Sequence, residues 1–218
     1  MNIMSLQRPR NEKELQEREA LGVIRASRFV RKYAHSHKPI NIKTIREIHH
    51  EIFAHAWPEI AGNYRDEELS ISCSELLLPH HTKVPELMKK LDEDLNIRLD
   101  KLKECNGLII SLHTKKTKKA INCIDEVIQT TAWLHHSITA IHPFREGNGR
   151  TARLAANLIL ERYGLVGISV KIEKENKNEY RKSLSQIDKY GDYEPLEEII
   201  SEGIIERYHG VSMKYYKV

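Results

Sequence analysis

The chain has 218 residues, of which 40% are hydrophobic and 30% are charged, and its formal net charge is +4. This balance suits one folded domain of ordinary size with an apolar core. It argues against a membrane protein, because no apolar run approaches the roughly 20 residues that span a bilayer. The weak positive charge, without interleaved aromatic residues, also predicts no nucleic-acid partner.

The amino-terminal residues MNIMSLQRPR lack the apolar stretch of a secretory signal. Three cysteines, Cys73, Cys105 and Cys123, are an odd number without the spacing of a metal site, and they fit a reducing compartment. We therefore expect a cytoplasmic protein, with secretion into a host cytosol as an effector as the alternative.

Helical periodicity dominates the chain from its start. Residues 11–36 begin at Asn11, a good N-cap, and their thin apolar stripe predicts a helix on the surface of the domain. The stripe comprises Leu15, Leu21, Ile24 and Phe29. A second helix follows the cap Asn41, and its predicted buried side comprises Ile42, Ile45, Ile48 and Ile52.

The stretch from Trp57 to His81 interrupts this pattern. It contains LSISCSELLLP, whose strand-like alternation ends at Pro79 and predicts a small β-hairpin or flap. Further helices are expected at about 84–103, 120–140, 174–188 and 193–208, and one begins at RTARLAANLILERYG. That last sequence is apolar on nearly every side, which indicates a buried helix. The fold class is therefore all-α with one small β-hairpin flap.

The run HPFREGNGRTAR at residues 142–153 carries the chemistry. Gly147-Asn148-Gly149 is a turn whose glycines can take backbone angles closed to other residues, and it opens directly into a helix. Free N–H groups and the positive end of the helix dipole then face the same space, which suits a phosphate. Arg150 and Arg153 lie on the first helical turn and can both bind a polyphosphate.

A carboxylate and a histidine flank this turn. Glu146 lies beside the expected phosphates, where a carboxylate commonly holds Mg²⁺. His142 can take a proton from a hydroxyl near neutral pH, and Phe144 is expected to anchor the loop in the core. Each residue alone has an ordinary structural explanation, such as a cap or a surface ion pair. Their order and spacing together favour phosphoryl-type transfer.

This run resembles the Fic family, whose motif is His-x-Phe-x-Asp/Glu-Gly-Asn-Gly-Arg-x-x-Arg. Every defined position is matched here. The resemblance extends from about Ile42 to Ile205, through AGNYR and LSIS at the flap, AWLHHSITAIHPF in the central helix and NEYRKSLSQIDKYGDYEPL in the last helices. It implies a Fic-type helical bundle, with a helical extension at residues 1–40, the Fic domain at 41–210 and a tail at 211–218.

The resemblance also implies an activity, since Fic proteins mostly move AMP from ATP to a Ser, Thr or Tyr hydroxyl of a target protein and release pyrophosphate. By that likeness His142 is the general base and Glu146 holds Mg²⁺ or Mn²⁺. The phosphates would be bound by Gly147, Asn148, Gly149, Arg150, Thr151 and Arg153.

Two further regions receive roles from the likeness. Tyr180 and Asp188 fall near the adenosine-contacting positions, and Asp188 stands where Asn is common in the family. The flap would hold the target segment by strand addition through Leu69, Ser70, Ile71 and Ser72.

Other readings remain open at this point. Within the family the transferred group could be another nucleotide or a phosphoryl group, although Doc-type kinases lack the full Gly-Asn-Gly-Arg. A toxin of a toxin–antitoxin pair is a third reading. A zinc protein is less favoured, because its candidate histidines lack the spacing of an HExxH site. Those candidates are His49, His50, His55, His135 and His136.

The mode of inhibition is not explained by a known pattern. Many Fic proteins carry Ser/Thr-x-x-x-Glu-Gly/Asn, and no full match occurs here. We expect either a separate inhibitory antitoxin chain or an N-terminal brake, for which the first predicted helix supplies Glu12, Glu14, Glu17 and Glu19.

Overall fold

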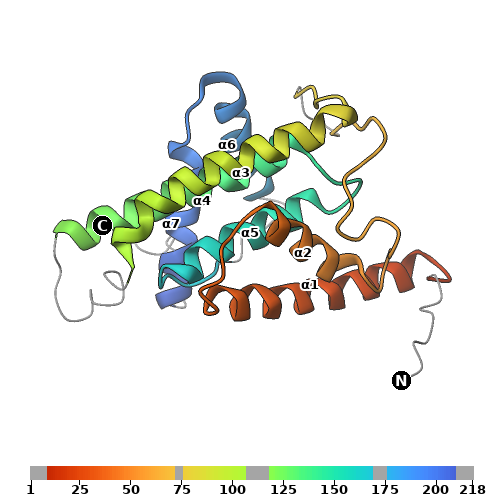
Figure 1. Cartoon of the computed structure of the whole chain (residues 1–218), viewed down its shortest axis with the longest axis horizontal. Helices are drawn as coiled ribbons and strands as arrows, with labels where there is room; N and C mark the ends of the chain where they lie inside the picture. The colour runs from red at the N-terminus through yellow and green to blue at the C-terminus, as the bar shows by residue number, and fades with distance from the viewer. Residues whose placement is uncertain (1–8, 72–75, 107–117, 169–175, 210–218) are drawn as a thin grey trace.

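A computed structural model describes residues 9–71, 76–106, 118–168 and 176–209 (Figure 1). Within these ranges the chain forms seven α-helices and two short 3₁₀ helices, and no strand. The α-helices are α1 (Glu12–Ala34), α2 (Ile42–Phe53), α3 (Val84–Lys101), α4 (Lys118–Ile141), α5 (Asn148–Arg162), α6 (Asn176–Tyr190) and α7 (Glu194–His209). The 3₁₀ helices are η1 (His81–Lys83) and η2 (Leu102–Cys105). The helical fold class is confirmed.

The predicted β-hairpin is not shown in the described part of the chain. Residues 63–71 and 76–80 run as irregular chain, apart from a bend at Glu67. Ser72, the last residue of the expected flap, lies outside the described residues.

Helices α4 and α5 form the centre of the fold, and α5 also contacts α1 and α2. Figure 1 shows α1 and α2 side by side along one edge, while α3 runs along α4. The side chains at this centre are fully or almost fully buried, among them Val127, Leu134, Ile138, Leu158 and Ile159. The sequence prediction of a buried helix after residue 147 is therefore confirmed.

Helix α1 packs differently from its prediction. Leu21 and Ile24 of the expected stripe are 59% and 49% exposed, whereas the residues buried on α1 are Gly22, Ala26, Val30 and Ala34. A Cβ at Gly22 would lie 1.9 Å from the carbonyl oxygen of Ile52, so α1 and α2 approach through a small-residue face. The predicted stripe was wrong for these two residues because close helix contact favours small side chains over large apolar ones.

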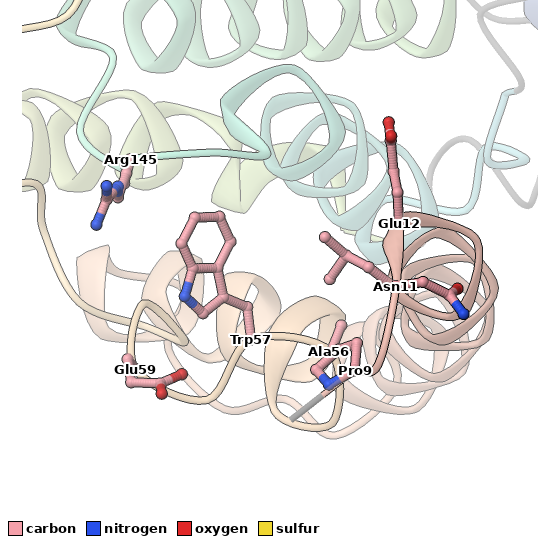
Figure 2. A pocket seen from close by; sticks show the side chains of 8 residues that line it. Pro9, Asn11, Glu12, Ala56, Trp57, Glu59 and Arg145 are labelled. Atoms are coloured by element: carbon pink, nitrogen blue, oxygen red, sulfur yellow. The ribbon is translucent and has the colours of Figure 1, made fainter. Parts of the chain in front are cut away.

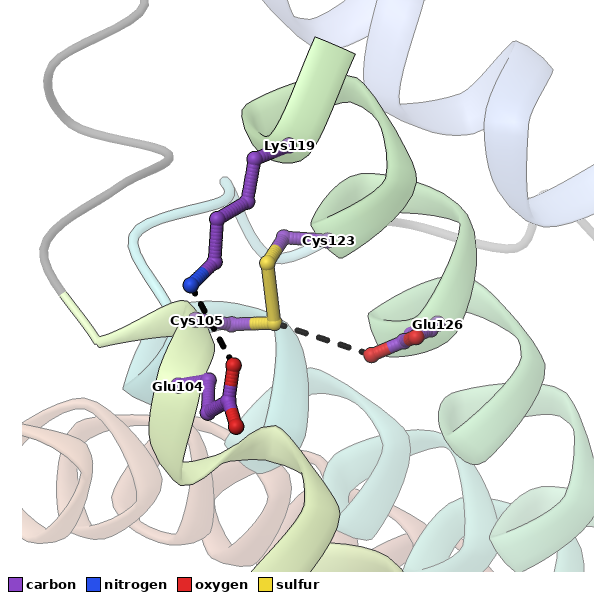
Figure 3. The surroundings of a disulfide bond; sticks show 5 residues. All are labelled: Glu104, Cys105, Lys119, Cys123 and Glu126. Carbon is purple, nitrogen blue, oxygen red and sulfur yellow. Dashed lines mark hydrogen bonds and ion pairs between the residues drawn. A yellow bond between two sulfur atoms is a disulfide. The ribbon is translucent and has the colours of Figure 1, made fainter. Parts of the chain in front are cut away.

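Cys105 of η2 and Cys123 of α4 form a disulfide, with Cα atoms 5.4 Å apart (Figure 3). An ion pair of Lys119 and Glu104, 3.2 Å long, spans the same junction. The cysteine count had suggested reduced thiols, and for this pair that expectation was wrong. The pairing depends on how η2 meets α4, which cysteine spacing does not reveal.

None of the helices in the described ranges is both long and apolar enough to cross a lipid bilayer.

Candidate active site

The loop of residues 142–147, called the motif loop here, joins α4 to α5 and is closed by Asn148. The Phe144 N–H donates to Asn148 Oδ1 at 2.8 Å, and Asn148 Nδ2 donates to the Phe144 carbonyl at 2.7 Å. Asn148 is 2% exposed. Its side chain therefore shapes the loop, while its backbone begins α5.

The motif loop is anchored to α2 by His49. The ring of this histidine stacks on that of fully buried Phe144, with centroids 3.9 Å apart. His49 Nδ1 accepts the Gly62 N–H at 2.9 Å, so the proton of the neutral ring is on Nε2, which donates to the Glu146 carbonyl at 3.0 Å. Burial lowers the pKa of His49 to about 4 and keeps it neutral. His49 therefore links the motif loop to α2. Both of its ring nitrogens are used in hydrogen bonds, so it is not placed to bind zinc.

Glycine is required at position 147 for two reasons. The residue has φ of 77°, a left-handed conformation in which other residues are strained. A Cβ there would also lie 2.3 Å from the ring of Phe53. The close approach of the turn to α2 therefore depends on Gly147.

His142 is held in the form of a base. Its Nδ1 lies 3.2 Å from the Thr139 carbonyl, which can only accept, so Nδ1 carries the proton and Nε2 keeps its lone pair. Burial is the main cause of a lowered pKa at His142, which favours the neutral ring. The residue also has φ of 51°, an uncommon backbone conformation for a side chain of this size.

Arg65, to which the sequence gave no role, supports this backbone. Its Nε donates to the His142 carbonyl at 2.8 Å, and its backbone N–H donates to the Pro143 carbonyl at 2.8 Å. The guanidinium also donates to the carbonyls of Glu67 and Pro79, and Arg65 is only 4% exposed. We call these contacts the Arg65 clasp. In the sequence, Arg65 is only a single arginine within AGNYR. Nothing in that pattern indicates that its side chain is buried or which carbonyls it contacts.

The two motif arginines have different partners. Arg150 pairs with Glu19 of α1 at 2.6 Å and with Glu146 at 3.1 Å. Arg153 instead hydrogen-bonds to Tyr180 of α6, and its Nη1 would lie 3.4 Å from a Cβ at Gly149. The α1 helix thus contacts the first arginine, and α6 the second.

Two buried side chains, Tyr180 and His135, hold Arg153 in position. The Tyr180 hydroxyl lies 3.2 Å from His135 Nε2, and His135 is 2% exposed. Burial lowers the pKa of His135 to about 3, so its ring is neutral and can accept the tyrosine proton. The tyrosine oxygen then keeps lone pairs for the Arg153 guanidinium. Among the described residues, this arrangement orients Arg153 without a carboxylate in an ion pair with it.

Glu146 has the properties of a cation ligand, and it lies at the edge of the group formed by Arg150, Arg153 and the start of α5. Its side chain is 55% exposed, and Oε1 accepts hydrogen bonds from the Gly147 N–H at 2.8 Å and from Arg150. Both contacts fall on Oε1, which leaves the second oxygen for an ion. An accessible carboxylate oxygen beside cationic groups fits Mg²⁺, which prefers oxygen ligands and retains several waters.

The other predicted site residues lie in varied environments. Thr151 is fully buried, and its hydroxyl has no partner within the described chain. Asp188 of α6 pairs with His136 of α4 at 2.8 Å. Leu69 and Ile71 are half-buried and Ser70 is exposed, all in irregular chain. The structure therefore gathers His142, Glu146, Gly147, Arg150 and Arg153 at one helix start, together with Tyr180.

A pocket of about 480 Å³ adjoins the motif loop through Arg145. Figure 2 shows Trp57 and Arg145 on one side of it, and Asn11 and Glu12 from the start of α1 on the other. The Arg145 guanidinium lies over the Trp57 ring at 5.2 Å and pairs with Glu67 at 2.6 Å. The pocket thus lies between α1 and the chain that leads to the expected flap.

Curated relatives resemble most of this chain. It is 30% identical over 183 residues to the protein adenylyltransferase Fic of Nematostella vectensis, covering 84% of this chain and 36% of that protein. It is 29% identical over 197 residues to the protein adenylyltransferase fic-1 of Caenorhabditis elegans, covering 88% and 34%. The chain therefore spans about a third of the length of these relatives.

Solved structures agree on the fold. Fic-1 residues 134–508 from C. elegans match with a TM-score of 0.66 and 26% identity, covering 96% of this chain and 54% of that one. The BepC protein of Bartonella tribocorum, solved with bound AMPPNP, matches with a TM-score of 0.59 and 18% identity, covering 88% and 87%.

The model of the Fic/DOC family matches residues 39–160, which contain α2 to α4, the motif loop and most of α5. This match covers more than half of the 218 residues. The chain therefore belongs to the Fic/DOC family.

Proposed function

We propose that this chain is a protein adenylyltransferase, which transfers AMP from ATP to a Ser, Thr or Tyr hydroxyl of a target protein. The observation that carries the proposal is the state of His142, whose Nδ1 proton is donated to the Thr139 carbonyl while Nε2 remains a free base. This base lies beside a helix start with two arginines. The names of the curated relatives support the same activity.

In the proposed reaction, the target hydroxyl oxygen attacks the α-phosphorus of ATP. An O–P bond forms to the target, and the bond from the α-phosphorus to the bridging oxygen breaks and releases pyrophosphate. The hydroxyl proton moves to His142 Nε2. The left-handed backbone of His142, held by the Arg65 clasp, fixes the direction of this nitrogen. Such positioning is a large part of catalysis of phosphoryl-type transfer.

The phosphates would bind at the start of α5. Arg150 and Arg153 supply positive charge, and the backbone N–H groups of Asn148 and Gly149 add donors at the helix N-terminus. Gly147 shapes the turn, and its own N–H donates to Glu146 Oε1. Thr151 would support the turn and not contact the phosphates directly, since its side chain is buried and its N–H donates to the Gly147 carbonyl at 2.9 Å. Tyr180 orients Arg153, and Asp188 remains the candidate for a contact to the nucleoside.

Glu146 would hold Mg²⁺ or Mn²⁺ through its exposed carboxylate. When bound, the ion neutralises charge on the phosphates and the leaving pyrophosphate. The protein's own share is to fix the carboxylate, which it does through the Gly147 N–H and Arg150.

The target segment would add as a strand along Leu69 to Ser72, the expected hairpin flap. The irregular backbone from Leu69 to Ile71 supports this, because chain outside a helix can offer its N–H and C=O groups to another segment. We retain residues 1–40 as an extension, 41–210 as the Fic domain and 211–218 as a tail. We retain a cytosol, its own or that of a host, as the place of action, and the Cys105–Cys123 disulfide is the observation that argues against it.

Glu19 is the proposed brake. Its carboxylate forms an ion pair with Arg150 at 2.6 Å. It therefore takes the position in which a phosphate oxygen would otherwise bind. The contact comes from α1 of the same chain, which favours an internal brake over a separate antitoxin chain. Because α1 packs against α2 and α5, its removal would expose buried surface of both helices, and a point substitution tests the brake more cleanly.

Transfer of label from ATP to proteins of a cell lysate tests the activity. ATP labelled at the α-phosphate should label protein in the presence of Mg²⁺, and His142→Ala should reduce labelling by about 100-fold or more. Label transferred only from the γ-phosphate would replace the proposal with phosphoryl transfer. Parallel reactions with the other α-labelled nucleotides identify the base, and toxicity relieved by a co-expressed partner would favour a toxin.

A further inference from the structure

Three side chains that the proposed reaction does not use gather at the two ends of residues 69–79. Glu68 precedes this segment, and His80 and His81 follow it. Their ligand atoms all lie within 4.8 Å of one another, and within the described residues this is the one such group of His, Cys, Asp and Glu. The zinc candidates considered from sequence lie elsewhere.

The distances within this group are close to those of a metal site. Glu68 Oε1 lies 3.3 Å from His80 Nε2 and 2.7 Å from His81 Nδ1. Ligand atoms around a tetrahedral ion at about 2.0–2.1 Å are about 3.3 Å apart. The His80 contact already has that spacing, and a small rotation of the His81 ring would give the other.

The surroundings of His80 and Glu68 also suit ion binding. His80 Nδ1 accepts the Thr82 N–H at 3.4 Å and lies 2.8 Å from the Thr82 hydroxyl. Metal binding at Nε2 would move the ring proton to Nδ1, where the hydroxyl oxygen is placed to accept it. Glu68 Oε1 accepts the backbone N–H of His81 at 3.1 Å, which holds the carboxylate in place. The imidazoles stack with centroids 4.4 Å apart.

We propose that Glu68, His80 and His81 bind a divalent transition-metal ion such as Zn²⁺. Two imidazoles and one carboxylate favour zinc over magnesium, which prefers oxygen ligands alone. The side chains of Glu68 and His80 are 55% and 58% exposed, so water can complete the coordination. This ion is separate from the Mg²⁺ proposed at Glu146.

The ion would cross-link the ends of the segment that carries Leu69 to Ser72. Its ligands stand next to the Arg65 clasp, because Arg65 donates to the carbonyls of Glu67 and Pro79, each one residue away from a ligand. Arg65 also donates to the His142 carbonyl. Metal binding would therefore stiffen the chain between the target-holding segment and the base. This consequence rests on the proposed function, whereas the metal site does not.

The test is titration of untagged, metal-stripped protein with Zn²⁺ by calorimetry, without nucleotide. The wild type should bind one equivalent, and Glu68→Gln and His81→Ala should each weaken that binding at least about tenfold. His55→Ala removes another exposed histidine and should bind as the wild type. Circular dichroism checks that each variant is folded.

Two results would overturn the site. One is the absence of stoichiometric zinc binding by folded wild type. The other is binding that Glu68→Gln and His81→Ala leave unchanged. Because no nucleotide or target is present, either failure is independent of whether the protein transfers AMP. For the cross-link itself, saturating Zn²⁺ should slow chymotrypsin cleavage after Leu76, Leu77 or Leu78, and an unchanged rate at full occupancy would remove that claim.

Discussion

The motif loop and the segment from Glu68 to His80 lie side by side through the Arg65 clasp, yet they are held in different ways. The motif loop is fixed from within by Asn148 and from α2 by His49 and Phe53. The described parts of the second segment are irregular, and Leu77 is 92% exposed. Hydrogen bonds hold its two ends, at Glu68 and at Pro79.

This difference matches two different tasks. A catalytic base must be held in one orientation, since a misplacement of about 1 Å can cost on the order of 100-fold in rate. A segment that pairs with varied target chains needs backbone groups that are still available. Arg65 joins the two, because one guanidinium bonds to carbonyls of both.

Substitution of Arg65 should have the largest effect on stability and rate, since it removes the hydrogen bonds that connect the two segments. In Arg65→Met, buried carbonyls lose their donors, and we expect a loss of about 3 kcal/mol or more in the free energy of unfolding. Transfer by the remaining folded protein should fall roughly 100-fold. Urea unfolding and initial rates measure both. Arg65→Lys keeps the charge but not the fork of donors, and should recover only part of the rate. Wild-type rates in Arg65→Met would separate the clasp from catalysis.

Acid should weaken the motif loop through His49. Its pKa of about 4 in the fold, against 6.5 when unfolded, means that the unfolded chain binds the proton more readily. The stabilisation is complete above pH 6.5 and is lost as the pH falls towards 4, by roughly 3 kcal/mol in all. Denaturant unfolding across this range measures the loss.

The matched variant is His49→Gln, which keeps one donor and one acceptor but does not titrate. Its stability should depend less steeply on pH between 6.5 and 4, with a residual slope from buried His135. Equal slopes in wild type and variant would show that His49 does not control the acid response.

The smallest effect is expected at the contact between α1 and Arg150. Glu19→Gln should raise the transfer rate about fivefold, because a partly buried ion pair worth about 1 kcal/mol no longer competes with the phosphate. Glu17→Gln removes the same charge from an exposed position of α1 and should leave the rate unchanged. Initial rates at subsaturating ATP give the comparison. A rise of the same size in both variants would indicate a general charge effect and not a brake.

The helices and the motif were legible from the sequence because their signals are local. Asn11 and Asn41 cap α1 and α2 as predicted, and Phe144 is the buried anchor of the loop. The face of α1 was misread because close packing at Gly22 depends on the Ile52 carbonyl, 30 residues away. The spacing of apolar residues within α1 does not indicate which residue of another helix packs against it.

The supporting residues of the site were also missed for a physical reason. Arg65 and His49 act by donating to backbone carbonyls of a distant loop, and those acceptors exist at every residue. A sequence therefore cannot indicate which carbonyl they reach. The same holds for the Cys105–Cys123 disulfide and for Glu19, one of four glutamates on its helix considered as a brake.

The central claim is that the motif loop presents His142 as the base for attack on the α-phosphorus. Mass spectrometry of the modified target, combined with measurement of released pyrophosphate, tests it most directly. The account predicts one adenylyl group on a hydroxyl side chain for each pyrophosphate released, and almost none of either with His142→Ala. A phosphoryl group on the target with release of ADP, or equal adenylylation by His142→Ala, would contradict it.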